Sequence, residues 1–288
     1  MSPFVVSPAA PHELLPACRL LFAATHAEHS RDRLLADGRA SALFVARDAG
    51  GRLHAAALVE ALPGAMGVAW APRGDSRDAI DAVTVAACAW LRERRVKVCQ
   101  AFAAASEREE MAPLERSGFR HATQLVFLRG DLPPECEPTR RLSFATARPP
   151  FSEEFAATLL ATHAGTLDCP ELNATRTPAE ILAGFTSSSA VEWHLACLSG
   201  ERVGVVVLEY VEDYGAADLT YLGVVPAARG RKLGAELLKF AVGEAVVARL
   251  LALNVSVDAR NEPAMKLYAR HGFVEYDRRE VWLASWPL

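Results

Sequence analysis

The order of apolar and polar positions repeats once along the chain. Residues 44–60 and residues 194–209 each have the pattern of a strand, a tight turn and a second strand. In both halves a further strand then precedes a segment with helical spacing of apolar side chains, at residues 80–91 in the first half and 233–247 in the second. A strand and a short helix follow in each half. The pattern predicts two copies of one α/β unit.

The two copies also keep the same length. Pro72 and Phe119 are 47 positions apart, as are Pro226 and Phe273, so no insertion separates the copies over that span. Each copy ends its last helix at a Gly-Phe pair, and glycine is the usual residue just past a helix end. Because a strand, helix, strand connection joins parallel neighbours, we expect an α/β (α+β) fold with two tandem domains, each a mixed, mostly antiparallel sheet flanked by helices.

Prolines separate the two copies. Five of them lie between residues 133 and 150, where they disfavour regular structure. The sequence therefore predicts a first domain at residues 1–132, a linker at residues 133–150 and a second domain at residues 151–288.

Charge and cysteine spacing exclude several classes of protein. The formal charge is −4, from 31 basic and 35 acidic residues, and no stretch gathers lysine and arginine as a nucleic-acid surface does. The six cysteines show no Cys-x-x-Cys spacing and the histidines no metal-ligand spacing. We therefore expect buried thiols, a cytoplasmic protein and no bound metal. The N-terminus lacks a signal-peptide pattern and no long apolar stretch is uninterrupted, so no membrane association is expected.

A basic turn in the second copy has the clearest chemistry. Arg229, Gly230, Arg231, Lys232 and Gly234 follow a strand and open the second copy's long helix. The first backbone N–H groups of a helix lack internal partners, and the helix dipole adds positive charge there, so such a turn suits a pyrophosphate. Glycines let phosphate oxygens approach, and the basic side chains add charge-assisted contacts. The alternative is an ordinary solvated turn.

Two segments of the second copy resemble the GCN5-related N-acetyltransferase (GNAT) superfamily. Arg229 and Gly234 match the first and last positions of its Gln/Arg-x-x-Gly-x-Gly/Ala signature, whereas Lys232 replaces the central glycine. A lysine tolerates a positive φ poorly, so the backbone at that position either is ordinary or accepts strain. Residues 261–273 resemble the family's Asn-x-x-Ala-x-x-x-Tyr-x-x-x-Gly-Phe segment nearly completely. The chain is thus similar to a tandem GNAT protein with a degenerate N-terminal copy.

The resemblance implies that the second domain binds acetyl-CoA (coenzyme A). In the family, the strand before the turn and the turn itself hold the cofactor, and the asparagine lies along its pantetheine arm. The implied cofactor residues are Leu222, Gly223, Val224, Arg229, Gly230, Arg231, Lys232, Leu233, Gly234, Ala235 and Asn261. The resemblance also implies Tyr268 as the general acid near the thioester sulfur. In the ordinary interpretation, Tyr268 is a core tyrosine and Asn261 is a helix cap.

An amine acceptor needs a base, because a lysine-like amine has a pKa of about 10.4 and is protonated at neutral pH. The family usually places carboxylates for this role on or beside the hairpin before the cofactor strand. The candidates there are Glu209, Glu212, Asp213 and Asp218. Asp218 is our choice because it precedes the cofactor strand closely, and a solvated hairpin charge is the alternative for each. Asp168, Glu171 and Arg176 lie in the segment where acceptor specificity is usually set, and they are alternatively an ordinary loop.

The first copy has lost these chemical features. On the shared register, Asp75 and Asp78 stand where the second copy has its basic turn, and Leu114 stands at the position of Tyr268. Pyrophosphate would be repelled there. The first domain is therefore interpreted as a degenerate copy.

The sequence therefore predicts an acyl-CoA-dependent N-acetyltransferase. Its second domain would move an acetyl (acyl) group from acetyl-CoA to a small-molecule or peptide amine by direct attack. Two alternatives remain: a non-catalytic CoA-binding sensor or scaffold, and an acyltransferase whose acceptor is a hydroxyl or a thiol. We expect no nucleic-acid partner, and a monomer or a homodimer.

Overall fold

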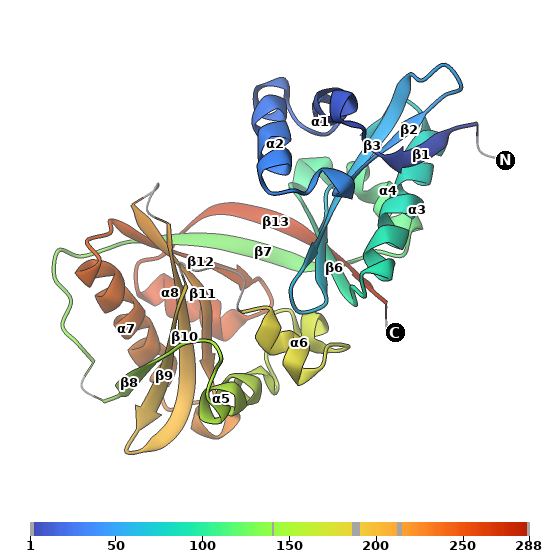
Figure 1. Cartoon of the computed structure of the whole chain (residues 1–288). Coiled ribbons are helices and arrows are strands. Elements are labelled where there is room, and N and C mark those ends of the chain that lie inside the picture. Colours follow the sequence, from blue (N-terminus) through green and yellow to red (C-terminus); the bar gives the residue numbers. More distant parts are fainter. Residues whose placement is uncertain (1–2, 140, 186–190, 212–214, 287–288) are drawn as a thin grey trace. The chain divides into compact units, whose positions relative to one another are not determined.

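The chain divides into two compact units (Figure 1). The first unit comprises residues 1–122 and 279–288, and the second comprises residues 123–278. The computed structural model describes residues 3–139, 141–185, 191–211 and 215–286. The first unit therefore combines the first part of the sequence with its last residues.

In the first unit, antiparallel hairpins lead into a parallel pair. The strand order is β1-β2-β3-β4-β6, with β5 beside β3, and β4 runs parallel to β6. Helix α3 connects β5 to β6. The elements are β1 (Val5–Pro8), α1 (Leu14–Leu21), α2 (Ala24–Ala36), β2 (Leu43–Arg47), β3 (Leu53–Leu62), β4 (Met66–Ala69), β5 (Arg73–Gly74), α3 (Arg77–Glu93), β6 (Val98–Ala103) and α4 (Ala112–Arg116).

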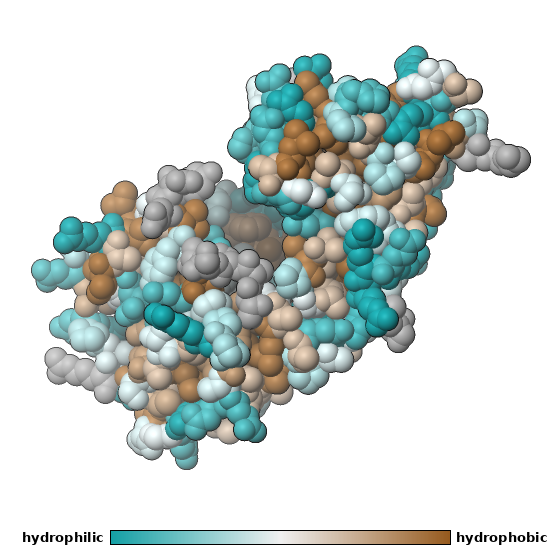
Figure 2. All heavy atoms as spheres, viewed as in Figure 1, coloured by the Kyte–Doolittle hydropathy of each residue, from teal (hydrophilic) through white to brown (hydrophobic). Residues whose placement is uncertain are grey.

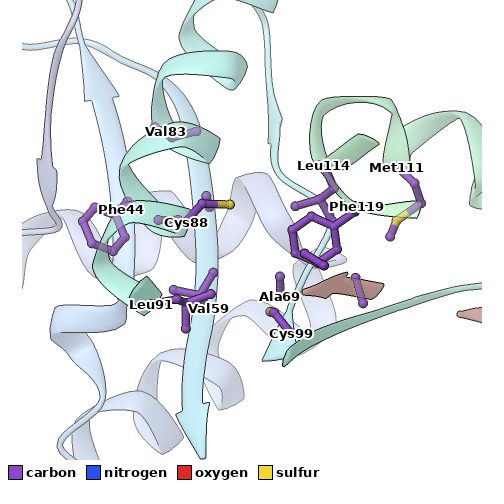
Figure 3. Packing of buried hydrophobic residues seen from close by; sticks show 14 of the residues in the cluster. Phe44, Val59, Ala69, Val83, Cys88, Leu91, Cys99, Met111, Leu114 and Phe119 are labelled. Carbon is purple, nitrogen blue, oxygen red and sulfur yellow. The ribbon is translucent and has the colours of Figure 1, made fainter. Parts of the chain in front are cut away.

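Apolar side chains cover both faces of this sheet. Val83, Cys88 and Leu91 of α3 pack on one face with Phe44 and Val59 of β2 and β3 (Figure 3). Alternate residues of the same strands pack on the other face against α1 and α2. Because both faces are covered, β2 and β3 are almost continuously apolar rather than alternating.

The second unit repeats this plan. Its strand order is β7-β12-β11-β10-β9-β8, and β11 runs parallel to β12. The remaining pairs run antiparallel. The elements are β7 (Arg120–Asp131), β8 (Ser143–Ala147), α5 (Glu153–His163), α6 (Pro178–Ala183), β9 (Val191–Leu198), β10 (Glu201–Val211), β11 (Ala216–Val224), α7 (Leu233–Val247), β12 (Ala252–Asp258), α8 (Glu262–Arg270) and β13 (Val274–Ser285).

Helices again lie on both faces of the second sheet. The larger cluster joins α7 and α8 to alternate residues of β10, β11 and β12, with Leu237 and Leu238 fully buried. The smaller cluster joins Phe155 and Leu159 of α5 to the other face of β9 and β10. The predicted architecture, a mixed and mostly antiparallel sheet flanked by helices, is confirmed.

Strands β7 and β13 contribute residues to both units. Residues 125–131 of β7 pair with β12 in the second unit, and residues 280–285 of β13 pair with β6 in the first. Each unit therefore includes a strand segment from the other half of the sequence. The compact units thus differ from a simple division at residues 132 and 151. Strand β8 lies within the segment expected to be a linker, where it forms an edge strand beside β9.

The predicted elements reappear with small changes at their ends. Helix α7 covers the expected residues 233–247, and α3 extends the expected helix to Arg77–Glu93. Gly118 and Gly272 have φ of +102° and +80° just past α4 and α8, as expected of helix-ending glycines.

The surface and the thiols agree with the composition. All six cysteines are free, and four of them are buried. Hydrophilic residues are interspersed with hydrophobic ones over the face shown in Figure 2. Every helix among the described residues is too short or too polar to cross a lipid bilayer.

Candidate active site

Strands β11 and β12 begin as a parallel pair and then separate. Their pairing runs from Ala216 with Ala252 to Leu219 with Val255, whereas β11 continues to Val224. Beside β10 the register of β11 shifts at Thr220, and a shift of this kind bends a strand. Residues 220–224 therefore stay paired with β10 on one edge and turn away from β12 on the other.

The free edge of β11 presents backbone donors. The N–H of Val225 donates to the carbonyl of Val203 at 3.0 Å, across the β10 side. Successive backbone groups of a strand alternate between its two edges, so the N–H groups of Leu222 and Val224 point to the β12 side. The hydrogen bond of the Val224 carbonyl is consistent with this orientation, because the carbonyl accepts from Nε of Arg229 at 3.1 Å.

A cavity of about 270 Å³ lies where the two strands separate. Residues 219–224 of β11 form one wall, and residues 256 and 257 of β12 belong to another. The loop after α5 and the first turns of α8 complete the lining. Three residues predicted for the cofactor or the chemistry line it from outside β11, namely Arg229, Asn261 and Tyr268.

The first unit keeps the corresponding strands together. Ala69 of β4 pairs with Ala101 of β6, at the end of a run that begins with Met66 and Val98. On the shared register the counterpart of Ala69 is Gly223, which lies beyond the last residue of β11 paired with β12. The strand separation that forms the cavity is therefore found in the second unit and not at the corresponding residues of the first.

The N-terminus of α7 offers further backbone donors. The helix begins at the buried Leu233, and no side-chain hydrogen bond from Lys232 caps its first turn. Gly230, with φ of +76°, has no atom within 4 Å of where a Cβ would stand. Arg231 and Lys232 are exposed beside it. This end of α7 therefore has the free donors, open space and positive charge that a pyrophosphate needs.

Lys232, which stands where the family signature has a glycine, has a left-handed backbone conformation. Its φ and ψ are 62° and 18°, in the left-handed region. For a residue with a side chain this region costs about 1–2 kcal/mol. Of the two alternatives at this position, an ordinary backbone or a strained one, the structure has the strained one.

Gly234 and Ala235 occupy the first turn of α7 and are half-buried. A Cβ on Gly234 would lie 3.5 Å from the side chain of Leu267, which is an ordinary contact. The N–H of Ala235 donates to the carbonyl of Lys232 at 3.3 Å. The packing around Gly234 therefore accepts an alanine, as the family signature does.

The start of α3 in the first unit is capped by its own side chain. Ser76 accepts a hydrogen bond from the N–H of Ala79 at 3.4 Å. Asp75 accepts from His54 at 2.8 Å and from Arg52 at 3.1 Å. One first-turn donor of this helix is thus capped internally, and a carboxylate stands before the helix where α7 has cations.

The guanidinium of Arg229 ties the end of β11 to the end of α5. Besides the Val224 carbonyl, it donates to the carbonyls of Gly165 at 3.1 Å and Thr162 at 2.9 Å. Its three nitrogens therefore all bond backbone oxygens. In this arrangement Arg229 shapes the cavity wall, and Arg231 and Lys232 are the cations left exposed to solvent at the turn.

Gly223 lets α5 approach β11 closely. A Cβ at this position would lie 2.7 Å from Cβ of Thr162 and 2.7 Å from Cε1 of Tyr221. The hydroxyls of Thr162 and Tyr221 are hydrogen-bonded at 2.7 Å, and burial raises the pKa of Tyr221 to about 12. The sequence pattern missed this Thr162 and Tyr221 pair, because the two residues are far apart in the chain and neither belongs to the family signature.

Asn261 caps helix α8. Its Oδ1 accepts from the N–H of Ala264 at 3.3 Å, and Pro263 lies in the first turn. The capping interpretation of this residue is therefore present in the structure. Asn261 also lines the cavity, so a contact with a ligand remains compatible with the cap.

Tyr268 lies on α8 with its ring in the core and one side on the cavity. It is 6% exposed, and its ring lies 5.6 Å from that of Phe273. Its hydroxyl has no hydrogen-bond partner among the described residues. Burial and the nearby Asp168 raise the pKa of the Tyr268 phenol well above its usual range.

Asp218 lies outside the cavity lining. Its Oδ1 accepts from Nδ2 of Asn254, its neighbour on β12, at 2.9 Å. Glu209 is its cross-strand partner on β10. The other two acids considered for the base, Glu212 and Asp213, lie outside the described residues.

Asp168 is the carboxylate that lines the cavity. Its Oδ1 accepts from the N–H of Asp258 at 2.8 Å, which fixes the loop after α5 to the end of β12. Desolvation by the surrounding protein raises the pKa of Asp168, although the residue as a whole is exposed to solvent. The sequence indicated Asp168 only as a possible acceptor contact.

The fully buried Asp258 holds this loop in place. It accepts from the N–H of Cys169 at 3.0 Å, from the Thr123 hydroxyl at 2.6 Å and from Arg260 at 2.7 Å. Burial opposes its ionisation, but the hydrogen bonds from Arg260 and Thr123 bring its pKa below the usual range. Arg260 also pairs with Glu171 at 2.7 Å. Glu171 is thus bound to this loop support, and the pattern gave no signal for Asp258.

A comparison with known families identifies the domain. Residues 161–273 match the acetyltransferase (GNAT) family. The second unit is a GNAT acetyltransferase domain. The match covers the separating strands, the basic turn and α8, and it supports acyl transfer as the general reaction. Among curated proteins, none matches this sequence.

Solved structures extend the likeness over the whole chain. A GCN5-related N-acetyltransferase from Sphaerobacter thermophilus aligns with 98% of this chain and 95% of its own, at 19% identity and a TM-score of 0.62. A tandem GNAT protein from the clavulanic acid biosynthesis pathway aligns over 98% of both chains, at 16% identity and a TM-score of 0.56. At these identities the likeness shows the fold, which is the tandem GNAT fold.

Proposed function

We propose that the chain is an acetyl-CoA-dependent N-acetyltransferase whose acceptor is a small-molecule or peptide amine. The observation that supports this most is the separation of β11 from β12. It leaves the backbone donors of one strand edge on a cavity that Arg229 also lines, just before the uncapped start of α7. The two sets of donors match a long ligand with an amide-containing arm at one end and a pyrophosphate at the other.

The residues of this domain divide the binding between them. The N–H groups of Leu222 and Val224 would bond the pantetheine amides and polarise the thioester carbonyl. The first N–H groups of α7, those of Leu233 and Gly234, would bond the pyrophosphate. Arg231 and Lys232 would add charge-assisted contacts. Asn261 would keep its capping bond and contact the arm from α8.

Tyr268 is our candidate for the general acid. Its raised pKa keeps the phenol protonated at neutral pH, so it can donate a hydrogen bond to the sulfur as the carbon–sulfur bond breaks. Its hydroxyl has no competing partner among the described residues.

Asp168 is a better candidate for the base than Asp218, because Asp168 lines the cavity whereas Asp218 is bonded to Asn254 outside it. Its raised pKa makes it a stronger base than an ordinary carboxylate. It would take the proton that the amine loses as the carbon–nitrogen bond forms.

The test is a reaction of the purified chain with acetyl-CoA and a panel of acceptors. The panel contains polyamines, amino sugars, amino acids and lysine peptides, together with the matching alcohols and thiols. Mass spectrometry of the acceptor distinguishes N-, O- and S-acetylation. We expect N-acetylation. Acylation of alcohols or thiols alone would instead support the hydroxyl or thiol alternative.

Tyr268→Phe tests the acid. We expect a loss in kcat of at least about 100-fold with little change in acetyl-CoA affinity, since general acid catalysis contributes about 10²–10⁴-fold. Tyr276→Phe is the control, because Tyr276 is 59% exposed and lies outside the cavity lining. Tight CoA binding without turnover on any acceptor would favour the sensor or scaffold function.

A further inference from the structure

Three ligand-type side chains converge on a second site in the GNAT domain. Glu192 and His194 extend from the same face of β9, two residues apart, and Glu244 reaches them from α7. One ligand atom from each lies within 4.8 Å of the others. The residues of this cluster are separate from those that line the cavity.

His194 is buried with an unused nitrogen. The residue is 4% exposed, and its Nε2 has no hydrogen-bond partner in the described part of the chain. Leaving a buried polar atom unpaired costs about 1–3 kcal/mol. The nearest carboxylate oxygen, Oε2 of Glu192, lies at 3.4 Å without the alignment of a hydrogen bond.

We propose that Glu192, His194 and Glu244 bind a divalent transition-metal ion of the zinc class. Zinc binds imidazole nitrogen and carboxylate oxygen at about 2.0–2.2 Å, so two ligands of a tetrahedral ion lie about 3.4 Å apart. The separation of His194 Nε2 from Glu192 Oε2 has this value. An ion would occupy the lone pair of Nε2, and small side-chain rotations would bring in Glu244. Three protein ligands and a water complete a common zinc coordination shell.

Neighbouring residues orient two of the three ligands. The hydroxyl of Tyr210 donates to Oε2 of Glu192 at 2.9 Å, as outer partners of metal-binding carboxylates commonly do. The ring of Phe240 packs edge-on to the imidazole, with centroids 4.9 Å apart, and is itself stacked on Phe144. The imidazole is therefore held by packing rather than by a hydrogen bond to Nε2.

The electrostatics of the cluster also favour a cation. Two carboxylates, Glu192 and Glu244, approach one buried imidazole and repel each other. A divalent ion relieves this repulsion. The alternative is a proton on His194 in place of the metal, which would still leave Nε2 without an aligned acceptor.

The metal would have a structural role. Glu244 lies eleven residues after Leu233, which is about 16 Å along α7 from the proposed pyrophosphate site. The ion would fasten the last part of α7 to β9. The inference therefore stands without the proposed reaction.

The experiment titrates the chelator-treated chain with Zn²⁺ alone, measured by calorimetry and native mass spectrometry. We expect one ion per chain and a rise in Tm, because a ligand that binds only the folded state stabilises it. His194→Gln should weaken zinc binding by at least about 100-fold, since even changes to the outer partners of a metal weaken binding by about 10–100-fold. Glu244→Gln, at a half-buried position, should also weaken binding and tests the site if His194→Gln fails to fold.

His54→Gln is the matched control. His54 also lies between two carboxylates, Asp48 and Asp75, but both of its nitrogens are hydrogen-bonded. We expect this variant to bind zinc as the parent chain does. Absence of a stoichiometric site, or unchanged affinity in folded His194→Gln or Glu244→Gln, would overturn the proposal. Cobalt bound in place of zinc should show no thiolate absorption, which would otherwise assign the ion to the cysteines instead.

Discussion

Lysine at position 232 has a backbone conformation that glycine adopts at little cost. We expect Lys232→Gly to leave the free energy of unfolding unchanged or to raise it by up to about 1 kcal/mol, because relief of the left-handed strain exceeds or offsets the chain entropy of glycine. Urea denaturation measures this. Arg231→Gly removes the same charge next to it without relieving a positive φ, so it should gain nothing. Equal effects of the two changes would contradict the strain at Lys232.

The carboxylate of Asp168 sets a pH dependence. As a base it must be ionised, so kcat/KM should fall as the pH drops through its pKa, which is raised above the ordinary carboxyl value of about 3.9. Asp168→Asn should lower activity by about 100-fold or more and remove this acidic limb of the profile.

The same raised pKa of Asp168 has the opposite effect on stability, which it favours at low pH rather than at high pH. Its contribution is present at low pH and is lost as the pH rises through the folded-state value. Asp168→Asn keeps an oxygen for the Asp258 N–H, so it should not destabilise the fold at neutral pH. An unchanged acidic limb, or unfolding of the variant at neutral pH, would contradict the assignment.

Residue-level prediction worked where a residue's neighbours are close in sequence. The departure at Lys232 and the capping by Asn261 both follow from a few adjacent positions. Asp258 gave no signal, because its partners Thr123 and Cys169 are 135 and 89 positions away. The cluster of Glu192, His194 and Glu244 was missed for the same reason, since a metal spacing read along one segment does not see a strand and a helix about 50 positions apart.

Replacing Gly223 or Gly234 with alanine tests the packing of the elements separately from ligand binding. Gly223→Ala should destabilise the GNAT domain by about 1–3 kcal/mol, because its Cβ would overlap Thr162 and push α5 from β11. Gly234→Ala should leave both stability and CoA affinity nearly unchanged, since its Cβ makes only an ordinary contact. Denaturation and CoA calorimetry on both variants measure this. A stable Gly223→Ala variant would show that α5 has more room than the structure gives it.

Elements with a strong period were predictable, and those without one were not. The apolar spacing gave α3 and α7 nearly to their ends. Strand β8 was missed because it is short, largely exposed and flanked by prolines, so neither alternation nor a buried run marks it. The separation of β11 from β12 was also missed, because the pattern tells which residues are extended and not where a parallel pair stops.

A substitution at Trp282 tests the division of the chain into its two units. It follows the GNAT domain in sequence, yet it is fully buried in the first unit's core and donates to Glu115 at 2.9 Å. Trp282→Ala should destabilise the first unit by about 3–5 kcal/mol. Limited proteolysis with mass mapping should then show earlier cleavage within residues 1–122. Phe273→Ala, in the second unit's core, should instead show earlier cleavage within residues 123–278. If the Trp282→Ala chain is first cleaved within residues 123–278, the assignment of Trp282 to the first unit is contradicted.

At the scale of the molecule, the duplication was visible in the sequence and the exchange of strands was not. The equal 47-residue spacing is a property of order along the chain, which a repeat preserves. Strand β13 has a run of buried residues from Val281 to Ala284 that would suit either sheet. The apolar pattern of a strand indicates which face is buried and how deeply, but it does not determine which strand lies beside it.

The exchanged strand has a consequence for synthesis on the ribosome. Residues 280–285 are translated after the entire GNAT domain, yet they complete the sheet of the first unit beside β6. The first unit is therefore synthesised first, but its sheet is completed last. The edge of β6 stays unpaired until then. Unpaired strand edges are sites of misassociation. Neither half of the chain, expressed alone, would contain a complete sheet, so a single cut cannot separate the two units.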